Sequence, residues 1–299
     1  MKNIGFGRCF GTFGEILQGA LPNGKNFLVT LPIQKFSRCM FTVEDQKENL
    51  EIFPYNKFKS LTFAKLFLAY YDLPLKGTII IDSDLPMGKG FASSSADLVA
   101  TAYAINDFYQ LRLSKLTIEE ILAQIEPTDG VLYENVVSYY YLDVKLHKQL
   151  GNLPEMAILA MDEGGEVNTV EYNAKEKVFL DNERILYEKL LTELEEAIKF
   201  QDLRTIGRIT TTSSVLNQKF RNNNYLEAML NINKEIGGIG VTVTHSGTCL
   251  GILLDKNSRD LQYQISQGYK LMQKINNLNN IYFFHTLCWD EQLKINWAA

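Results

Sequence analysis

The stretch that decides the fold is Asp84-Leu-Pro-Met-Gly-Lys-Gly-Phe-Ala-Ser-Ser-Ser-Ala-Asp97. Before it, residues 77–82 form a short run rich in β-branched side chains, which predicts a buried strand. After it, residues 96–111 carry apolar side chains at helical spacing, which predicts a helix of about four turns. A loop rich in glycine and serine therefore joins a strand to the N-terminus of a helix.

The start of this helix is chemically suited to an anion. Its first backbone N–H groups have no partner within the helix and lie at the positive end of the helix dipole. Gly88 and Gly90 allow the backbone to approach an oxygen atom, and Lys89 adds a positive charge. The serines that follow supply hydroxyls for a phosphate or a metal ion. The residues alone leave two interpretations open, an anion site and a tight turn with a serine cap.

Composition and charge limit the class of protein. The chain has 299 residues, enough for two domains that each bury a core, and its 46% hydrophobic and 22% charged residues are typical of a soluble globular protein. A net charge of −5 without a basic cluster argues against nucleic acid as a partner. The four cysteines are far apart and form no CxxC pair, which indicates reduced thiols. No signal peptide or membrane-spanning run is visible, so we expect a cytoplasmic protein without a membrane partner.

The first half of the chain predicts a sheet with helices. Residues 5–14 are too rich in glycine for a regular strand throughout, so we expect a strand that leads into a turn there. A hairpin with its tip at residues 22–24 follows, with residues 26–33 as its second strand. Further strands are predicted at 37–43 and 51–53, a largely buried helix at 57–71, a helix from 117 to about 125, and a strand at 136–145.

The second half predicts helices on one antiparallel sheet. After a linker at residues 151–154, we expect strands at 156–161 and 280–289 and a hairpin at 237–255 whose tip exposes His245 and Ser246. Four helical stretches are predicted at 182–200, 202–219, 224–236 and 259–275. The fold class is therefore α+β, with an N-terminal domain at residues 1–151 and a C-terminal domain at residues 152–299.

The glycine–serine stretch resembles a known motif. Pro86-Met-Gly-Lys-Gly-Phe-Ala-Ser-Ser-Ser-Ala96 is similar to the phosphate-binding motif of the GHMP kinases, Pro-x-Gly-x-Gly-Leu-Gly-Ser-Ser-Ala-Ala. The chain departs from it at Phe91, Ala92 and Ser95, and the methyl group of Ala92 is the change that could crowd a phosphate. The resemblance implies a nucleotide-binding loop formed by Pro86, Gly88, Lys89, Gly90, Ala92, Ser93, Ser94 and Ser95.

Three other segments resemble the L-threonine kinase branch of the same superfamily. Its opening is resembled by Gly11-Thr-Phe-Gly-Glu-Ile-Leu-Gln-Gly19 together with the Phe27-Leu-Val-Thr-Leu-Pro-Ile33 strand. A later segment of that branch is similar to Glu126-Pro-Thr-Asp-Gly130, and a third segment is similar to the His-Ser-Gly at 245–247. On residues alone, 126–130 could be only a helix stop. The resemblance implies Asp129 as catalytic base, Ser94 and Glu126 as Mg²⁺ ligands, and substrate contacts from Glu15, Gln18, Thr128, Ser246 and Gly247.

The resemblance thus implies a two-domain GHMP kinase fold, with a ribosomal S5 domain 2-like N-terminal domain and a ferredoxin-like C-terminal domain. It implies transfer of the γ-phosphoryl group of ATP, with Mg²⁺, to the hydroxyl of an amino acid, foremost L-threonine to O-phospho-L-threonine. Homoserine, serine or another small alcohol stays open as acceptor, as does a nucleotide-binding regulator without transfer activity. His245 is an alternative base, and a homodimer stays open as the oligomeric state.

Overall fold

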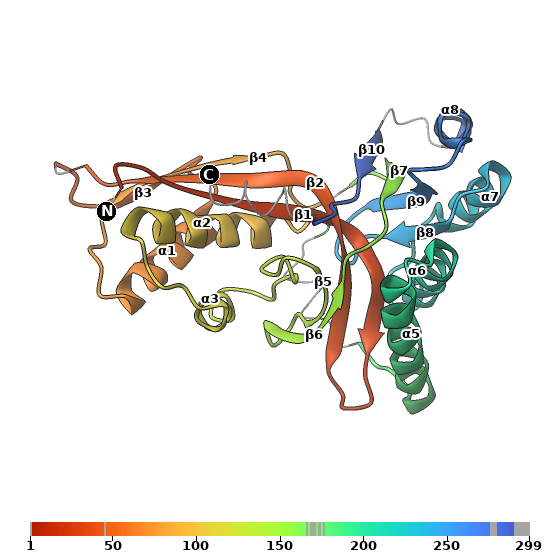
Figure 1. Cartoon of the computed structure of the whole chain (residues 1–299), viewed down its shortest axis with the longest axis horizontal. Coiled ribbons are helices and arrows are strands. Elements are labelled where there is room, and N and C mark those ends of the chain that lie inside the picture. The colour runs from red at the N-terminus through yellow and green to blue at the C-terminus, as the bar shows by residue number, and fades with distance from the viewer. Residues whose placement is uncertain are drawn as a thin grey trace.

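The computed structural model describes residues 2–44, 46–165, 167, 172, 175, 177–275 and 280–289. Figure 1 shows two parts, each a sheet with helices beside it. The helices of the first part are α1 (Phe58–Tyr70), α2 (Ser93–Tyr109) and α3 (Lys115–Leu122), and those of the second are α5 (Asp181–Lys199), α6 (Leu203–Asn217), α7 (Leu226–Ile236) and α8 (Leu261–Ile275). A long hairpin of β1 (Gly5–Ala20) and β2 (Asn26–Thr42) runs through the first part and bends down beside α5 and α6. This hairpin is the element against which both parts pack.

The first sheet is built around β2. β1 pairs antiparallel with β2 along its length, and the opposite edge of β2 pairs with β4 (Gly77–Ser83) and β5 (Val136–Tyr140). The sheet order is β3-β4-β2-β5-β6, where β3 is Leu50–Phe53 and β6 is Lys145–Gly151. The predicted strands at 26–33 and 37–43 are therefore parts of one long strand. The predicted strand at 136–145 is instead two strands, because the chain turns after Tyr140 and Val144 has a positive φ of 50°.

The prediction of a turn within residues 5–14 is wrong, because β1 continues through its glycines. A Cβ atom on Gly5 would lie 2.1 Å from the carbonyl oxygen of Ala104, and one on Gly7 would lie 2.0 Å from that of Ala100. Both contacts belong to helix α2 (Ser93–Tyr109). The glycines thus allow a helix to lie directly on a strand, and register shifts after Phe10 and Thr12 bend β1 toward the second part.

Helices α1 (Phe58–Tyr70), α2 and α3 (Lys115–Leu122) cover one face of the first sheet (Figure 1). Helix α2 is buried along most of its length, which explains its small and apolar residues. It begins where the loop after β4 ends. The sheet and this helix thereby fix the position of the loop at residues 84–92.

The second sheet has the strand order β10-β7-β9-β8. Its strands are β7 (Met156–Asp162), β8 (Gly240–Val243), β9 (Cys249–Asp255) and β10 (Ile281–His285). In chain order this is 4-1-3-2, the antiparallel arrangement of ferredoxin-like folds. Helices α5 (Asp181–Lys199), α6 (Leu203–Asn217), α7 (Leu226–Ile236) and α8 (Leu261–Ile275) accompany it, close to the predicted ranges.

The two sheets share part of one hydrophobic core. Phe13 of β1, Phe91 of the loop and Phe284 of β10 pack with ring centroids 5.4–5.5 Å apart. Cys9, Cys39 and Cys249 are buried free thiols. No helix in the described ranges combines the length and the apolar character that crossing a membrane requires. The shared core means that the two parts meet through packed side chains at the loop.

Candidate functional site

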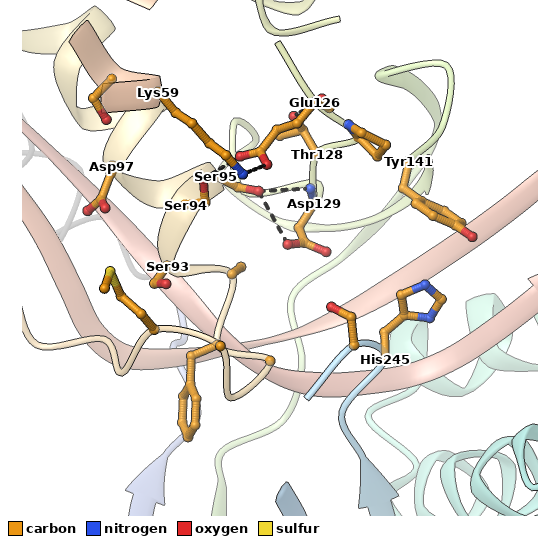
Figure 2. A pocket seen from close by; sticks show the side chains of 18 of the residues that line it. Lys59, Ser93, Ser94, Ser95, Asp97, Glu126, Thr128, Asp129, Tyr141 and His245 are labelled. Carbon is orange, nitrogen blue, oxygen red and sulfur yellow. Dashed lines mark hydrogen bonds and ion pairs between the residues drawn. The ribbon is translucent and has the colours of Figure 1, made fainter. Parts of the chain in front are cut away.

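A cavity of ≈ 330 Å³ lies in front of the N-terminus of helix α2 (Figure 2). Six parts of the chain form its walls: β1, the start of α1, the loop with the start of α2, the segment after α3, the turn after β5, and the turn between β8 and β9. Elements far apart in sequence therefore meet at one helix terminus.

The loop at residues 84–92 is held from two sides. On one side, the N–H groups of Thr12 and Gly14 in β1 donate hydrogen bonds to the carbonyl oxygens of Phe91 and Gly90, at 3.2 and 3.5 Å. On the other side, the β8–β9 turn approaches so closely that a Cβ atom on Gly247 would lie 2.0 Å from the carbonyl oxygen of Lys89. Phe91 anchors the loop in the shared core, which explains the bulky residue at this motif position. The loop is thus a rigid part of the cavity wall.

Ala92 occupies a backbone conformation that favours glycine. It is the N-cap of α2 and has φ 53° and ψ 30°, in the left-handed region. The motif it resembles has glycine here, and the structure gives the reason for that preference. The methyl group introduces backbone strain, because L-residues in this region cost about 1–2 kcal/mol.

We therefore expect Ala92→Gly to stabilise the protein. Relief of the strain is partly offset by the greater entropy of glycine in the unfolded chain, about 0.4–1 kcal/mol, so the free energy of unfolding should rise by about 0.5–1 kcal/mol. Urea denaturation measures it. The control is Ala96→Gly inside α2, which should lower the same free energy by about 1 kcal/mol or more. A lower unfolding midpoint for Ala92→Gly would contradict the strain at this position.

The N-terminus of α2 has no side-chain cap. Ala96 N–H is the first that donates within the helix, to the carbonyl of Ala92. The backbone N–H groups of residues 93–95 therefore lie at the cavity without a helical partner, at the positive end of a 17-residue helix. This terminus can bind an anion such as a phosphate group.

Residues 126–129 form the wall opposite. Thr128 fixes this segment, since its N–H donates to the carbonyl of Tyr141 at 3.1 Å and its hydroxyl donates to the carbonyl of Glu126 at 3.0 Å. Ser95 of α2 holds Asp129, through a hydroxyl that donates to Asp129 Oδ2 at 3.3 Å and accepts from Asp129 N–H at 3.2 Å. Figure 2 shows this pair at the edge of the helix terminus.

Asp129 and Glu126 differ in their partners. Glu126 accepts hydrogen bonds from the hydroxyl of Ser94 and from the ammonium group of Lys59, so its carboxylate is paired. Asp129 has the Ser95 hydroxyl as its partner. Burial raises the pKa of Asp129 to about 6, and the negative charge of Glu126 adds to this, while the Ser95 hydrogen bond opposes it. A carboxyl group with this pKa can take up a proton near neutral pH.

His245 lies across the cavity from Asp129 (Figure 2). It is buried, and both ring nitrogens have partners: Nδ1 is 2.7 Å from Gln18 Oε1, and Nε2 is 3.1 Å from Lys177 Nζ. Burial and the nearby charge of Lys177 hold the pKa of His245 well below its usual value. A neutral ring with both nitrogens engaged is poorly placed to act as a base, so Asp129 is the better candidate.

The structure brings most of the predicted site residues together. Those that line the cavity are Gly88, Gly90, Ala92, Ser93, Ser94, Ser95, Glu15, Glu126, Thr128, Asp129 and Ser246. Pro86, Lys89, Gln18 and Gly247 lie around it without lining it. The Lys89 ammonium group binds Asp162 Oδ2 at 2.7 Å and the carbonyl of Gly165 at 2.6 Å, and so ties the loop to the end of β7.

Sequence reasoning missed the cations of the cavity. Lys57 and Lys59 line it from the start of α1, where Lys57 binds Asp97 Oδ2 at 2.6 Å. The apolar spacing of residues 57–71 predicted a core helix, and it did not indicate that the N-terminal lysines face the loop. Tyr141 was also missed, because it belonged to a predicted strand and lies instead in the turn after β5. The two lysines in the first turn of this predicted helix were the available signal.

The chain is similar in sequence to known proteins. Residues 56–134 match the model of the GHMP kinases N terminal domain. The chain is 26% identical to L-threonine kinase of Citrobacter freundii over 263 residues, 86% of this chain and 88% of that protein. It is 23% identical to L-threonine kinase of Salmonella typhimurium, over 87% of this chain and 86% of the relative.

The solved structures agree in fold. The homoserine kinase of Cytophaga hutchinsonii superposes with a TM-score of 0.70 at 16% identity and covers 96% of each chain. These matches agree with the α+β architecture, the loop and the helix terminus described above. The chain contains a GHMP kinases N terminal domain within a GHMP kinase fold, and L-threonine kinases are among the proteins to which it is similar. It is a phosphotransferase that acts on a hydroxyl group, and GHMP kinases use ATP as phosphate donor.

Proposed function

We propose that this kinase transfers the γ-phosphoryl group of ATP to the hydroxyl of a small amino acid, with L-threonine as acceptor and O-phospho-L-threonine as product. The observation that carries the proposal is that the N-terminus of α2 and Asp129 face one cavity, together with Glu15. A phosphate site and a candidate base at the same cavity are what phosphoryl transfer to an alcohol requires. The two L-threonine kinases that match along most of the chain support the choice of acceptor.

The donor would bind at the loop and the helix terminus. Backbone N–H groups of residues 93–95 would hold phosphate oxygens, and Lys57 and Lys59 at the cavity would offset their charge. We place the nucleotide-binding domain at residues 1–151 and the C-terminal domain at 152–299, since the chain passes from the first sheet to the second between β6 and β7. The acceptor would lie between these parts.

Ser94 and Glu126 form a donor set that fits Mg²⁺. Both side chains present oxygen atoms, they touch each other, and they line the cavity. Mg²⁺ prefers oxygen ligands and commonly takes only one or two from the protein, with phosphate and water oxygens completing its shell. Within the described ranges, no group of three or more His, Cys, Asp or Glu side chains is placed to hold a metal ion. When bound there, the ion would offset negative charge on the phosphates.

Asp129 would act on the acceptor. Its carboxylate would accept the hydroxyl proton as the hydroxyl oxygen forms a bond to the γ-phosphorus, and the bond from that phosphorus to the bridging oxygen would break to release ADP. The transition state of such transfers is loose, so positioning and charge stabilisation supply most of the acceleration. The Ser95 hydrogen bonds would keep the carboxylate oriented during this step.

The proposal is tested by measuring ADP release with Mg²⁺-ATP across L-threonine, L-serine, L-homoserine and neutral small alcohols. We expect the highest kcat/KM with L-threonine, and mass spectrometry should detect a phosphorylated amino acid. A higher value with L-homoserine or L-serine would move the assignment to that acceptor. ATP hydrolysis without any acceptor, or no turnover with any of them, would support a nucleotide-binding regulator, the alternative that the strained Ala92 favours.

A further inference from the structure

A second, much smaller chamber adjoins the cavity and has no role in the mechanism above. Its volume is ≈ 10 Å³, about the space of one water molecule or one carboxylate oxygen. It shares Tyr141 and His245 with the main cavity, so the two spaces have a common wall. Its polar lining includes Gln18 of β1, Asn26 of β2, Asn217 of α6 and Lys177 of the segment before α5.

Two amide groups at this chamber are buried with an unused donor. Gln18 and Asn217 are 4% and 3% exposed, and neither Gln18 Nε2 nor Asn217 Nδ2 has a hydrogen-bond partner among the described residues. Since Gln18 Oε1 faces His245 Nδ1 at 2.7 Å, the amide nitrogen of Gln18 is left as the free end. An unsatisfied buried donor costs about 1–3 kcal/mol, and native structures keep few of them. These donors indicate a missing acceptor.

Lys177 adds a positive charge to the same chamber. Its ammonium group is 3.1 Å from His245 Nε2 and 3.4 Å from the Tyr141 hydroxyl, and it lies 4.3 Å from the ring centre of Tyr172. In the part of the chain that the structure describes, no carboxylate lies within ion-pairing distance of it. Burial lowers the pKa of Lys177 to about 7, an effect that the charge of Glu15 opposes. An anion bound beside Lys177 would stabilise its charged form.

Glu15 provides a hydrogen-bond acceptor at the main cavity, whereas the chamber presents donors. It is 3% exposed, and its Oε2 has no hydrogen-bond partner among the described residues. Its charge acts on Lys177, and the charge of Asp129 acts on it. A buried carboxylate oxygen of Glu15 without a partner among the described residues therefore lines the same cavity as the candidate base Asp129.

We propose that the chamber binds the carboxylate of the acceptor substrate through Lys177, Gln18 and Asn217, while Glu15 binds its ammonium group. This inference rests on the proposed function and narrows the acceptor to a zwitterionic hydroxy amino acid whose hydroxyl reaches Asp129. One carboxylate oxygen enters the chamber, and the other lies at its wall near Tyr141. A neutral alcohol or an amine without the carboxylate would leave the three donors unsatisfied, so the chamber selects against it.

The test compares L-threonine with L-threoninamide, which keeps the hydroxyl and the amine but lacks the negative charge. For the unaltered enzyme, we expect kcat/KM to be about 100-fold higher with L-threonine. Lys177→Met should raise KM for L-threonine about 100-fold, leave kcat within a few-fold, and leave both the reaction of L-threoninamide and the KM for ATP unchanged. Lys177→Arg should recover part of the preference. The matched control is Lys175→Met, an exposed lysine two residues away, which should change nothing.

Calorimetric titration of L-threonine provides a readout independent of turnover. If Lys177→Met loses L-threonine affinity and Lys175→Met keeps it, the chamber is the carboxylate site. An equal loss for both substrates, or an unchanged preference in Lys177→Met, would overturn the inference while leaving the kinase assignment intact. If no hydroxy amino acid is phosphorylated, the proposed function fails. The calorimetric titration then tests the carboxylate site by itself, and absence of L-threonine binding to the unaltered protein would overturn this inference as well.

Discussion

Asp129→Asn is expected to lower kcat by about 10³-fold while KM for ATP stays within about threefold. Asparagine has nearly the same shape and can keep a hydrogen bond to Ser95, so the segment at residues 126–129 should remain in place. What is lost is the ability to accept the proton of the acceptor hydroxyl. The effect is measured by steady-state kinetics with nucleotide binding followed separately. A kcat within about tenfold of the unaltered enzyme, about 1.4 kcal/mol in activation free energy, would show that Asp129 is not the base.

The pH dependence gives an independent check of the same assignment. Because the pKa of Asp129 is raised to about 6, the carboxyl is protonated below this pH and cannot accept a proton, so kcat should fall tenfold per unit on the acid side. The residual activity of Asp129→Asn should not show this fall in kcat at acidic pH. Asp143→Asn, in the exposed turn after β5, should retain both the rate and the profile.

The same raised pKa has a consequence for stability. The folded protein binds the Asp129 proton more tightly than the unfolded chain, whose aspartate has a pKa near 3.8. Ionisation of this group therefore costs stability as the pH rises from about 4 through 6, and the cost persists at neutral pH. Asp129→Asn should consequently unfold at a higher denaturant concentration than the unaltered protein at pH 7, despite its loss of activity. If Asp129→Asn is less stable than the unaltered protein at pH 7, the carboxyl group of Asp129 is not buried with a raised pKa.

Gly247→Ala should lower kcat/KM for ATP by about 100-fold or more. The added Cβ would lie 2.0 Å from the carbonyl oxygen of Lys89, 2.2 Å from its carbon and 2.5 Å from the nitrogen of Gly90. All three are backbone atoms of the loop, so no side chain can move aside, and the loop must shift by roughly 1 Å. Such a shift displaces the loop that leads into α2, and misplacement by that amount costs about 10²-fold in rate.

The control for this variant is Gly24→Ala at the tip of the β1–β2 hairpin. Gly24 has φ +80°, and a Cβ there would meet nothing within 4 Å. This variant should be less stable because of backbone strain, yet its kinetic constants should not change. If Gly247→Ala behaves like Gly24→Ala, with stability lost and kcat/KM for ATP preserved, the β8–β9 turn does not position the loop.

The local parts of the fold were predictable because their signals are short-range. The strand at 77–83 follows from its β-branched residues, and helices α2, α5, α6 and α7 follow from apolar spacing. The N-terminus of α2 could be expected at an anion site because a loop of small residues opens the helix. Similarity to the family then supplied Asp129, Glu15 and Glu126, which the pattern of residues alone would have left as a helix stop and a hairpin.

The glycines of β1 could not be placed correctly from local sequence patterns. Glycine is normally evidence against a regular strand, and residues 5–14 were expected to turn for that reason. What keeps Gly5 and Gly7 in the strand is helix α2, which contacts them from about a hundred residues further along the chain. The lysines at the start of α1 are a similar case. Helical periodicity predicts which face of the helix is apolar, but it does not predict which other element the first turn of the helix contacts.

By itself, the sequence determined the α+β class, the loop that opens α2, and the resemblance to the GHMP kinases, since each is written in consecutive residues. Only the tertiary structure decided that Ala92 is strained, that Lys89 binds Asp162 instead of lining the cavity, and that Gln18, Asn217 and Lys177 meet behind Tyr141 and His245. The physical reason is that these facts depend on distances across sheet registers and between packed elements. Periodicity along the chain carries no information about such distances.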